Sequence, residues 1–116
     1  MPAIHIFTGS DPKPMQFGLV VTDRRHAAHA AALLAGAAAR GWDARCFLTD
    51  SGVCLLEDEH FMEQARARPL AVAVCRHSVD ELLPGCDVAA LAKVVVMGSQ
   101  FQGAKLAKSA GVLLVL

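Results

Sequence analysis

Five short apolar runs alternate with segments of helical character along this chain. The runs cover residues 17–22, 44–49, 70–74, 93–97 and 112–116. Each is short and predominantly apolar, which is typical of a strand buried on both faces. Such strands belong to parallel sheets, because the helical crossovers that connect them cover the faces of the sheet. The alternation therefore predicts a small doubly wound, flavodoxin-like α/β domain with a mainly parallel five-stranded sheet.

End signals mark the helices between these runs. Thr22 or Asp23 can cap an Ala- and Leu-rich helix that ends at Gly41. Ser78 and Glu81 have the spacing of a capping box, so a short helix is expected to begin there. The complete set of expected helices is 24–40, a turn at 53–56, 60–68, a short helix from 78, and 102–110.

Residues 1–15 stand apart from this pattern as an N-terminal leader, and residues 16–116 form the expected domain. Two prolines within residues 9–14 deny a helix or a central strand there, and a strand over the apolar run 4–8 stays open. The N-terminus lacks the basic and long apolar regions of a signal peptide. The most apolar segment, residues 27–39, is too short to cross a bilayer. We therefore expect a cytoplasmic protein with no membrane segment.

Charge and hydrophobic content narrow the possible partners. Eleven Lys and Arg residues balance eleven Asp and Glu residues. Binding nucleic acid through bulk charge needs a basic excess, so that class of function is excluded. The hydrophobic set reaches 54% in only 116 residues. A chain this small cannot bury all of that surface in a monomer, so a homo-oligomer is expected, unless the high alanine content accounts for the excess.

Ligands of parallel sheets bind outside the carboxyl ends of the strands. The residues predicted to line this crevice come from four strand ends. They are Asp23 with Thr22; Asp50, Ser51 and Gly52; Cys75, Arg76, His77 and Ser78; and Gly98 and Ser99 with Gln100.

Cys75 is the leading candidate for chemistry among them. It follows a strand and precedes a helix, so backbone N–H groups and the cationic Arg76 and His77 would favour its thiolate. The alternative is a small apolar residue that ends a buried strand. Cys46 lies within a strand and is expected in the core. Cys54 and Cys86 are weaker candidates, the latter as a resolving thiol or an incidental one.

No metal or cofactor is expected. Cys75 and His77 form one close pair of potential ligands, but no second pair follows at zinc spacing. Gly98, Gly103 and Lys105 imitate a phosphate-binding loop, yet the lysine is one residue late and no Ser or Thr follows it. The dinucleotide fingerprint G-x-G-x-x-G is also missing after the first strand. With no C-x-x-C pair and no export signal, the four cysteines are interpreted as reduced thiols.

Three segments together resemble the DsrE/DsrF-like (TusD-like) sulfur-relay family over residues 16–116. They are F-L-T-D-S-G-V-C-L-L at 47–56, the strand that runs into Cys75, and M-G-S at 97–99 before the last helix and strand. The resemblance implies a sulfur carrier or sulfurtransferase in which Cys75 takes sulfane sulfur as a persulfide from a donor protein and passes it to an acceptor. It also implies a homotrimer or hexamer. The alternative is a non-catalytic oligomeric module of the same fold that binds a small ligand or a partner.

Overall fold

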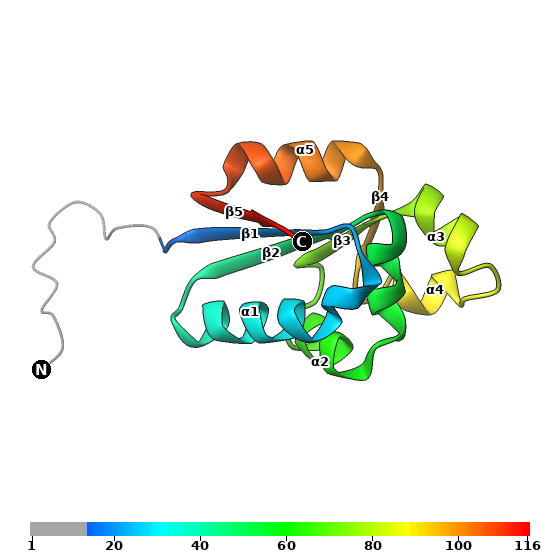
Figure 1. Cartoon of the computed structure of the whole chain (residues 1–116), viewed down its shortest axis with the longest axis horizontal. Helices are drawn as coiled ribbons and strands as arrows, with labels where there is room; N and C mark the ends of the chain where they lie inside the picture. The colour runs from blue at the N-terminus through cyan, green and yellow to red at the C-terminus, as the bar shows by residue number, and fades with distance from the viewer. Residues whose placement is uncertain (1–13) are drawn as a thin grey trace, which may run out of the picture.

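The computed structural model describes residues 14–116 and contains a five-stranded sheet in which every pairing is parallel (Figure 1). The strand order is β4-β3-β2-β1-β5. This confirms the predicted doubly wound α/β domain. The strands are β1 (Gln16–Val21), β2 (Asp43–Leu48), β3 (Val72–Cys75), β4 (Val96–Gly98) and β5 (Val112–Val115). The run at 4–8 and most of the expected leader lie outside the described residues.

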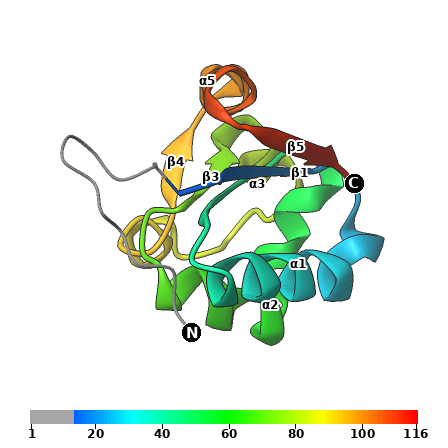
Figure 2. The same cartoon turned by 90° about the vertical axis from the view of Figure 1, so that its left-hand side faces the viewer.

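The strand order decides which helix covers which face. The chain steps in one direction from β1 to β4 and then returns across the sheet to place β5 on the other side of β1. Because parallel crossovers are right-handed, a reversal of direction moves the helix to the opposite face. Accordingly α1 (Ala27–Ala39) and α2 (Glu59–Ala67) lie on one face and α5 (Gln100–Ser109) lies on the other (Figure 2).

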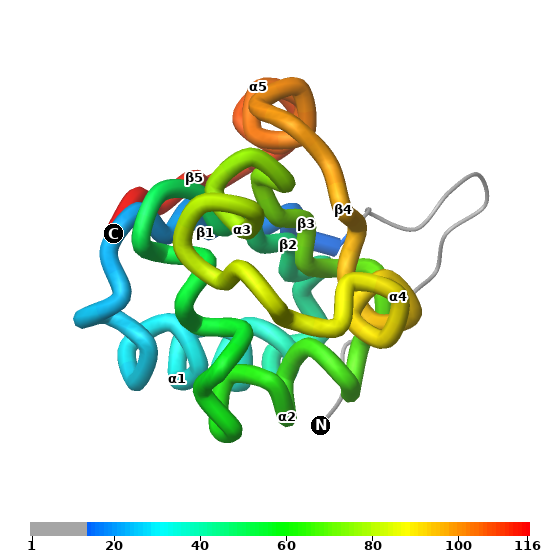
Figure 3. Tube along the Cα trace, turned by 90° about the vertical axis from the view of Figure 1, so that its right-hand side faces the viewer, coloured from blue at the N-terminus to red at the C-terminus, as the bar shows by residue number. Residues whose placement is uncertain are grey.

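The remaining elements are short, and several gather where the strands end. They are η1 (Arg24–His26), η2 (Asp50–Glu57), α3 (Arg76–Leu82) and α4 (Val88–Leu91). Figure 3 views the molecule from this end, with α3 lying beyond the carboxyl ends of the strands. The helix expected over 24–40 begins as the 3₁₀ turn η1, and α4 was not expected. Within residues 14–116, no helix is long and apolar enough to span a membrane.

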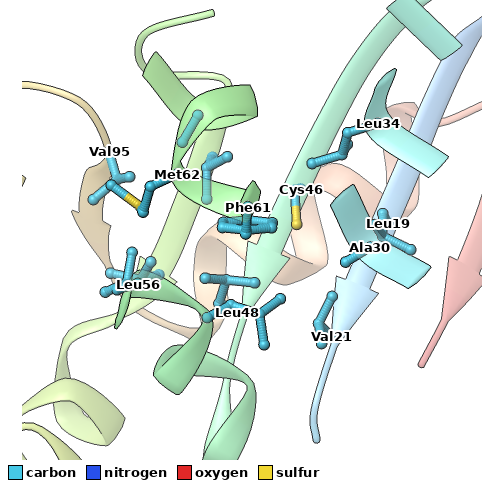
Figure 4. Close-up of a cluster of buried hydrophobic side chains, with 14 of the residues drawn as sticks. Leu19, Val21, Ala30, Leu34, Cys46, Leu48, Leu56, Phe61, Met62 and Val95 are labelled. Carbon is cyan, nitrogen blue, oxygen red and sulfur yellow. The ribbon is translucent and has the colours of Figure 1, made fainter. Parts of the chain in front are cut away.

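The core fills the space between the sheet and the helices α1 and α2 (Figure 4). Leu19, Leu48 and Phe61 are fully buried there, and Cys46 lies among them on β2, as expected. Burying a side chain of this size stabilises the fold by about 1.5–3 kcal/mol relative to leaving it in water. The apolar runs of β1 and β2 seen in the sequence therefore supply one side of this core.

The capping box expected at Ser78 and Glu81 is wrong. The helix α3 begins two residues earlier, at Arg76, and Cys75 is its N-cap residue. Ser78 lies inside the first turn, where its hydroxyl is taken by a tertiary hydrogen bond, and Glu81 forms an ion pair with His77. A capping box does exist at the start of α5, formed by Ser99 and Gln102.

Candidate functional site

Cys75 lies at the junction of β3 and α3, in the middle of one end of the sheet. Its neighbour across the ladder is Gly98 of β4, and β2 runs along the other side of β3. The residue is 6% exposed, so the thiol is nearly enclosed. The strand order thus places Cys75 between the ends of β2 and β4, which supply its polar surroundings.

Two polar side chains that reach Cys75 are anchored to the end of β2. The Ser78 hydroxyl oxygen accepts a hydrogen bond from the Asp50 backbone N–H at 3.1 Å, which leaves its own O–H proton free to donate. Gln100 Nε2 donates to Thr49 Oγ1 at 2.8 Å, which leaves the second amide proton free. The side chains of Ser78 and Gln100 and the backbone N–H groups of Ser78 and His77 are the polar groups beside Cys75 that lower the pKa of its thiol.

These donors decide the protonation of the thiol. Burial raises the pKa of Cys75, but the hydrogen bonds from Ser78, Gln100 and the His77 backbone outweigh burial and hold the pKa below the ordinary thiol value. Cys46 is enclosed in the core, and there burial raises the pKa of the thiol far above its ordinary value. Of these two cysteines, only Cys75 has a lowered pKa.

The side chains of Arg76 and His77 act differently from the sequence-based expectation. Arg76 Nε bonds Asp80 Oδ1 at 2.9 Å, and His77 Nε2 lies 2.6 Å from Glu81 Oε1, both one turn along the same helix. Ion pairs this exposed contribute little. His77 supports the thiolate through its backbone N–H, and the lowered pKa of Cys75 rests on hydrogen bonds rather than on neighbouring cations.

Asp23, Ser51 and Gly52 form a separate group that fastens η2 to the end of β1. The Ser51 hydroxyl accepts from the Arg24 backbone N–H at 3.0 Å. Asp23 is the N-cap of η1. A Cβ added at Gly52 would lie 2.0 Å from the carbonyl oxygen of Val21, so only glycine allows this approach. These three predicted crevice residues hold the scaffold together and do not bond to Cys75.

The other predicted residues border the thiol more closely. Asp50 takes part through its backbone N–H, in a left-handed conformation with φ of 50°. Ser99 caps α5, and the Gln102 side chain folds back to accept from the Ser99 N–H at 2.8 Å. This fold-back occupies the space where a Gly98 side chain would stand. The first turn of α5 is thus bonded by its own residues rather than left open for an anion.

Thr49 is the site residue that sequence reasoning missed. It had been assigned to the end of a strand, whereas β2 ends at Leu48 and Thr49 is the buried N-cap of η2. Its hydroxyl positions Gln100. The sequence feature that could have identified Thr49 is its position directly before Asp50, at one of the four strand ends already singled out.

A separate cavity of about 380 Å³ lies between α5 and the sheet, away from Cys75. Apolar side chains of the sheet and α5, including Phe47, Val96 and Leu106, line it together with the polar Gln16 and Lys105. Within the described part of the chain, no group of three or more His, Cys, Asp or Glu side chains is placed to hold a metal ion.

No protein-family model, no curated protein and no solved structure matches this chain.

Proposed function

We propose that this protein is a cytoplasmic sulfur-relay protein of the DsrE/DsrF-like kind that carries sulfane sulfur as a persulfide on Cys75. The observation that carries the proposal is the polar surroundings of a nearly buried cysteine: the Ser78 hydroxyl and the Gln100 amide, which Asp50 and Thr49 hold in place, and the backbone N–H groups of His77 and Ser78. A purely structural cysteine needs no such donors, as Cys46 illustrates.

Loading is a thiol exchange at sulfur. The Cys75 thiolate attacks the terminal sulfur of a donor persulfide, a new bond forms between the Cys75 sulfur and that sulfur atom, and the donor's S–S bond breaks. The donor sulfur leaves with the electron pair as a thiolate. The proton on the transferred sulfur stays with it or passes to water, so no external oxidant or reductant is needed.

Unloading uses the same donors in the opposite role. An acceptor thiolate attacks the outer sulfur of the Cys75 persulfide, and Cys75 departs as a thiolate. Because a thiol of lower pKa is a better leaving group, the hydrogen bonds from Ser78 and Gln100 assist this step as well. A carrier must both accept and release its cargo, and one set of donors serves both directions.

The small exposed area of Cys75 limits the shape of its partners. A cysteine residue that is 6% exposed would be reached by a narrow group, such as a low-mass polysulfide or a persulfide at the tip of a projecting loop. The donor and acceptor proteins would therefore present their cysteines on protruding segments, and a homo-oligomer would offer several copies of the site.

Intact-protein mass spectrometry after incubation with inorganic polysulfide tests the proposal. The wild type should gain the mass of one sulfur atom, and peptide mapping should place it on Cys75. Cys75→Ser should gain none, whereas the matched control Cys86→Ser should load like the wild type. Sulfur found on Cys54 or Cys86, or loading that survives in Cys75→Ser, would remove the basis of the proposal.

The cavity beneath α5 favours a second candidate, a non-catalytic module that binds a small ligand. Its volume of about 380 Å³ lies at the lower end of the range for small-molecule sites, roughly 300–1,000 Å³. In that case a ligand would raise the melting temperature of the wild type and Cys75→Ser equally. Ala73→Phe, which fills the cavity from β3, would abolish the shift, and no sulfur would load on Cys75.

A further inference from the structure

The edge strand β5 carries an uncovered apolar surface. Its four residues, V-L-L-V, are 37–64% exposed, although each is a large hydrophobic residue. They make up half of the eight large hydrophobic residues that are exposed in the described part of the chain. The sheet order ends at β5, and Figure 2 shows the strand at the margin of the sheet.

The backbone of β5 also directs hydrogen-bonding groups outward. Leu116 N–H donates to Val20 at 2.8 Å, and its carbonyl accepts from Thr22 N–H at 2.7 Å, so both groups face β1. Peptide groups alternate in direction along a strand. Leu113 and Val115 therefore point their N–H and C=O groups away from β1, where no partner strand lies within residues 14–116.

We propose that β5 pairs with β5 of a second copy of this chain, antiparallel and across a two-fold axis perpendicular to the sheet. The outward groups of Leu113 then bond those of Val115 in the other copy, and the reverse pair forms by symmetry. Leu114 of the two copies meet on the axis as a non-hydrogen-bonded pair. The two sheets become one continuous sheet through this contact.

A second copy fits this edge better than an unrelated strand does. Because every residue of β5 is apolar, an antiparallel copy in this register places apolar side chains opposite apolar side chains, with Leu113 facing Val115 and Leu114 facing Leu114. The strand carries no charge, so two copies meet without like-charge repulsion. It also lacks the Lys, Pro or bulge with which monomeric proteins protect a sheet edge. The opposite edge, β4, is shorter, and its residues are half-buried.

This contact restricts the possible assemblies. A two-fold axis generates a dimer, or a hexamer built from three dimers, whereas a closed trimer contains no two-fold axis. The inference rests on the β5 edge alone and is independent of the chemistry of Cys75.

Sedimentation velocity at micromolar concentration tests the contact with Val115→Lys. Val115 is the most exposed β5 residue, and its outward N–H has no partner within residues 14–116, so the variant should fold, which circular dichroism verifies. The wild type should be a dimer or hexamer, and Val115→Lys should lose the contact and sediment as a smaller species. Phe101→Lys makes the same exchange at an exposed site on α5 and should match the wild type.

A cysteine cross-link tests the register in the otherwise native chain. With diamide as the oxidant, Leu114→Cys should form a disulfide with the same residue of a second copy, because non-hydrogen-bonded pairs bring Cβ atoms close together. Val112→Cys should not, because its symmetry mate lies about four residues, or 13 Å, away along the strand. The proposal would be overturned if the wild type were a monomer or a trimer, or if Val115→Lys kept the wild-type mass. It would also be overturned if Phe101→Lys dissociated to the same extent as Val115→Lys, or if Leu114→Cys formed no cross-link.

Discussion

At the scale of single residues, the two buried cysteines show that burial alone does not set the chemistry of a thiol. Cys46 is surrounded by apolar core, and desolvation raises the pKa of its thiol. Desolvation also raises the pKa of Cys75, but polar groups from α3 and from Gln100 outweigh it and lower the pKa. The pKa values of the two thiols differ because polar groups that can hydrogen-bond surround Cys75 and not Cys46. Such groups come largely from the residues at the strand ends.

Substitutions at the two neighbours of Cys75 should therefore have unequal effects. Ser78→Ala removes a hydroxyl that donates to the sulfur, and it should slow alkylation of Cys75 at neutral pH by about an order of magnitude, the effect of losing one hydrogen bond to a charged group. Arg76→Ala breaks an exposed pair with Asp80 and should leave the rate nearly unchanged. Timed labelling with iodoacetamide and peptide mapping measures both rates. If Arg76→Ala slowed alkylation more than Ser78→Ala does, the Arg76 cation rather than the Ser78 hydroxyl would be the main cause of the lowered pKa of Cys75.

Two glycine substitutions should change stability in opposite directions. Gly52→Ala drives a methyl group into the Val21 carbonyl and should destabilise the fold by about 1–3 kcal/mol or more, as overpacking does. Gly36→Ala lies in α1, where a Cβ meets only the end of the Arg40 side chain at 3.6 Å, and it should stabilise by about 0.5–1 kcal/mol. Urea denaturation measures both. A neutral Gly52→Ala would mean that η2 is not held against β1.

The sequence singled out Cys75 as the leading candidate but did not reveal the contacts that surround it. Cys75 could be found because it directly follows a strand. Its activation depends on pairs that are distant along the chain, such as Thr49 with Gln100 and Asp50 with Ser78. Local sequence patterns do not reveal such contacts, so the sequence alone attributed the stabilisation of the Cys75 thiolate to the adjacent charges of Arg76 and His77.

At the scale of elements, helix starts were harder to predict than helix existence. The spacing of Ser78 and Glu81 is that of a capping box, yet α3 begins at Arg76, and the Ser78 hydroxyl accepts a hydrogen bond from Asp50 of η2. The Ser99 and Gln102 pair has the same spacing and does cap α5. The local spacing alone therefore does not distinguish the two helix starts.

The cap of α5 gives a direct prediction. Ser99→Ala removes the hydroxyl that accepts from the Phe101 N–H and should cost about 0.5–2 kcal/mol. Ser109→Ala, at the exposed end of the same helix, should change stability by less than about 0.5 kcal/mol. Thermal melts of the two variants provide the comparison, and equal melting temperatures would show that the cap contributes nothing.

At the scale of the whole molecule, the fold class and the helices flanking the sheet could be predicted from short apolar runs that alternate with helical segments, because a buried parallel strand has a recognisable composition. The strand order, the reversal that sends α5 to the opposite face, and the uncovered β5 edge did not follow. Each is set by how strands pair across the sheet rather than by the composition of any one of them.

The lowered pKa of Cys75 should appear in the stability of the whole protein as a function of pH. Because the thiol is more acidic in the folded state, its contribution is present above the unfolded thiol pKa of about 8.5 and is lost as pH falls through the folded value. The free energy of unfolding of the wild type, relative to Cys75→Ser, should therefore rise with pH between these two values. Urea titrations across that window measure the difference, and a flat difference would contradict it.

The central claim, that the polar surroundings of a nearly buried Cys75 lower the pKa of its thiol, is tested most directly by competitive alkylation of the four thiols as a function of pH. Under native conditions Cys75 should react first at neutral pH, with a rate profile that levels off below the ordinary thiol pKa, while Cys46 stays unmodified until the protein unfolds. The account is contradicted if Cys54 or Cys86 reacts first, or if Cys75 stays protected until unfolding.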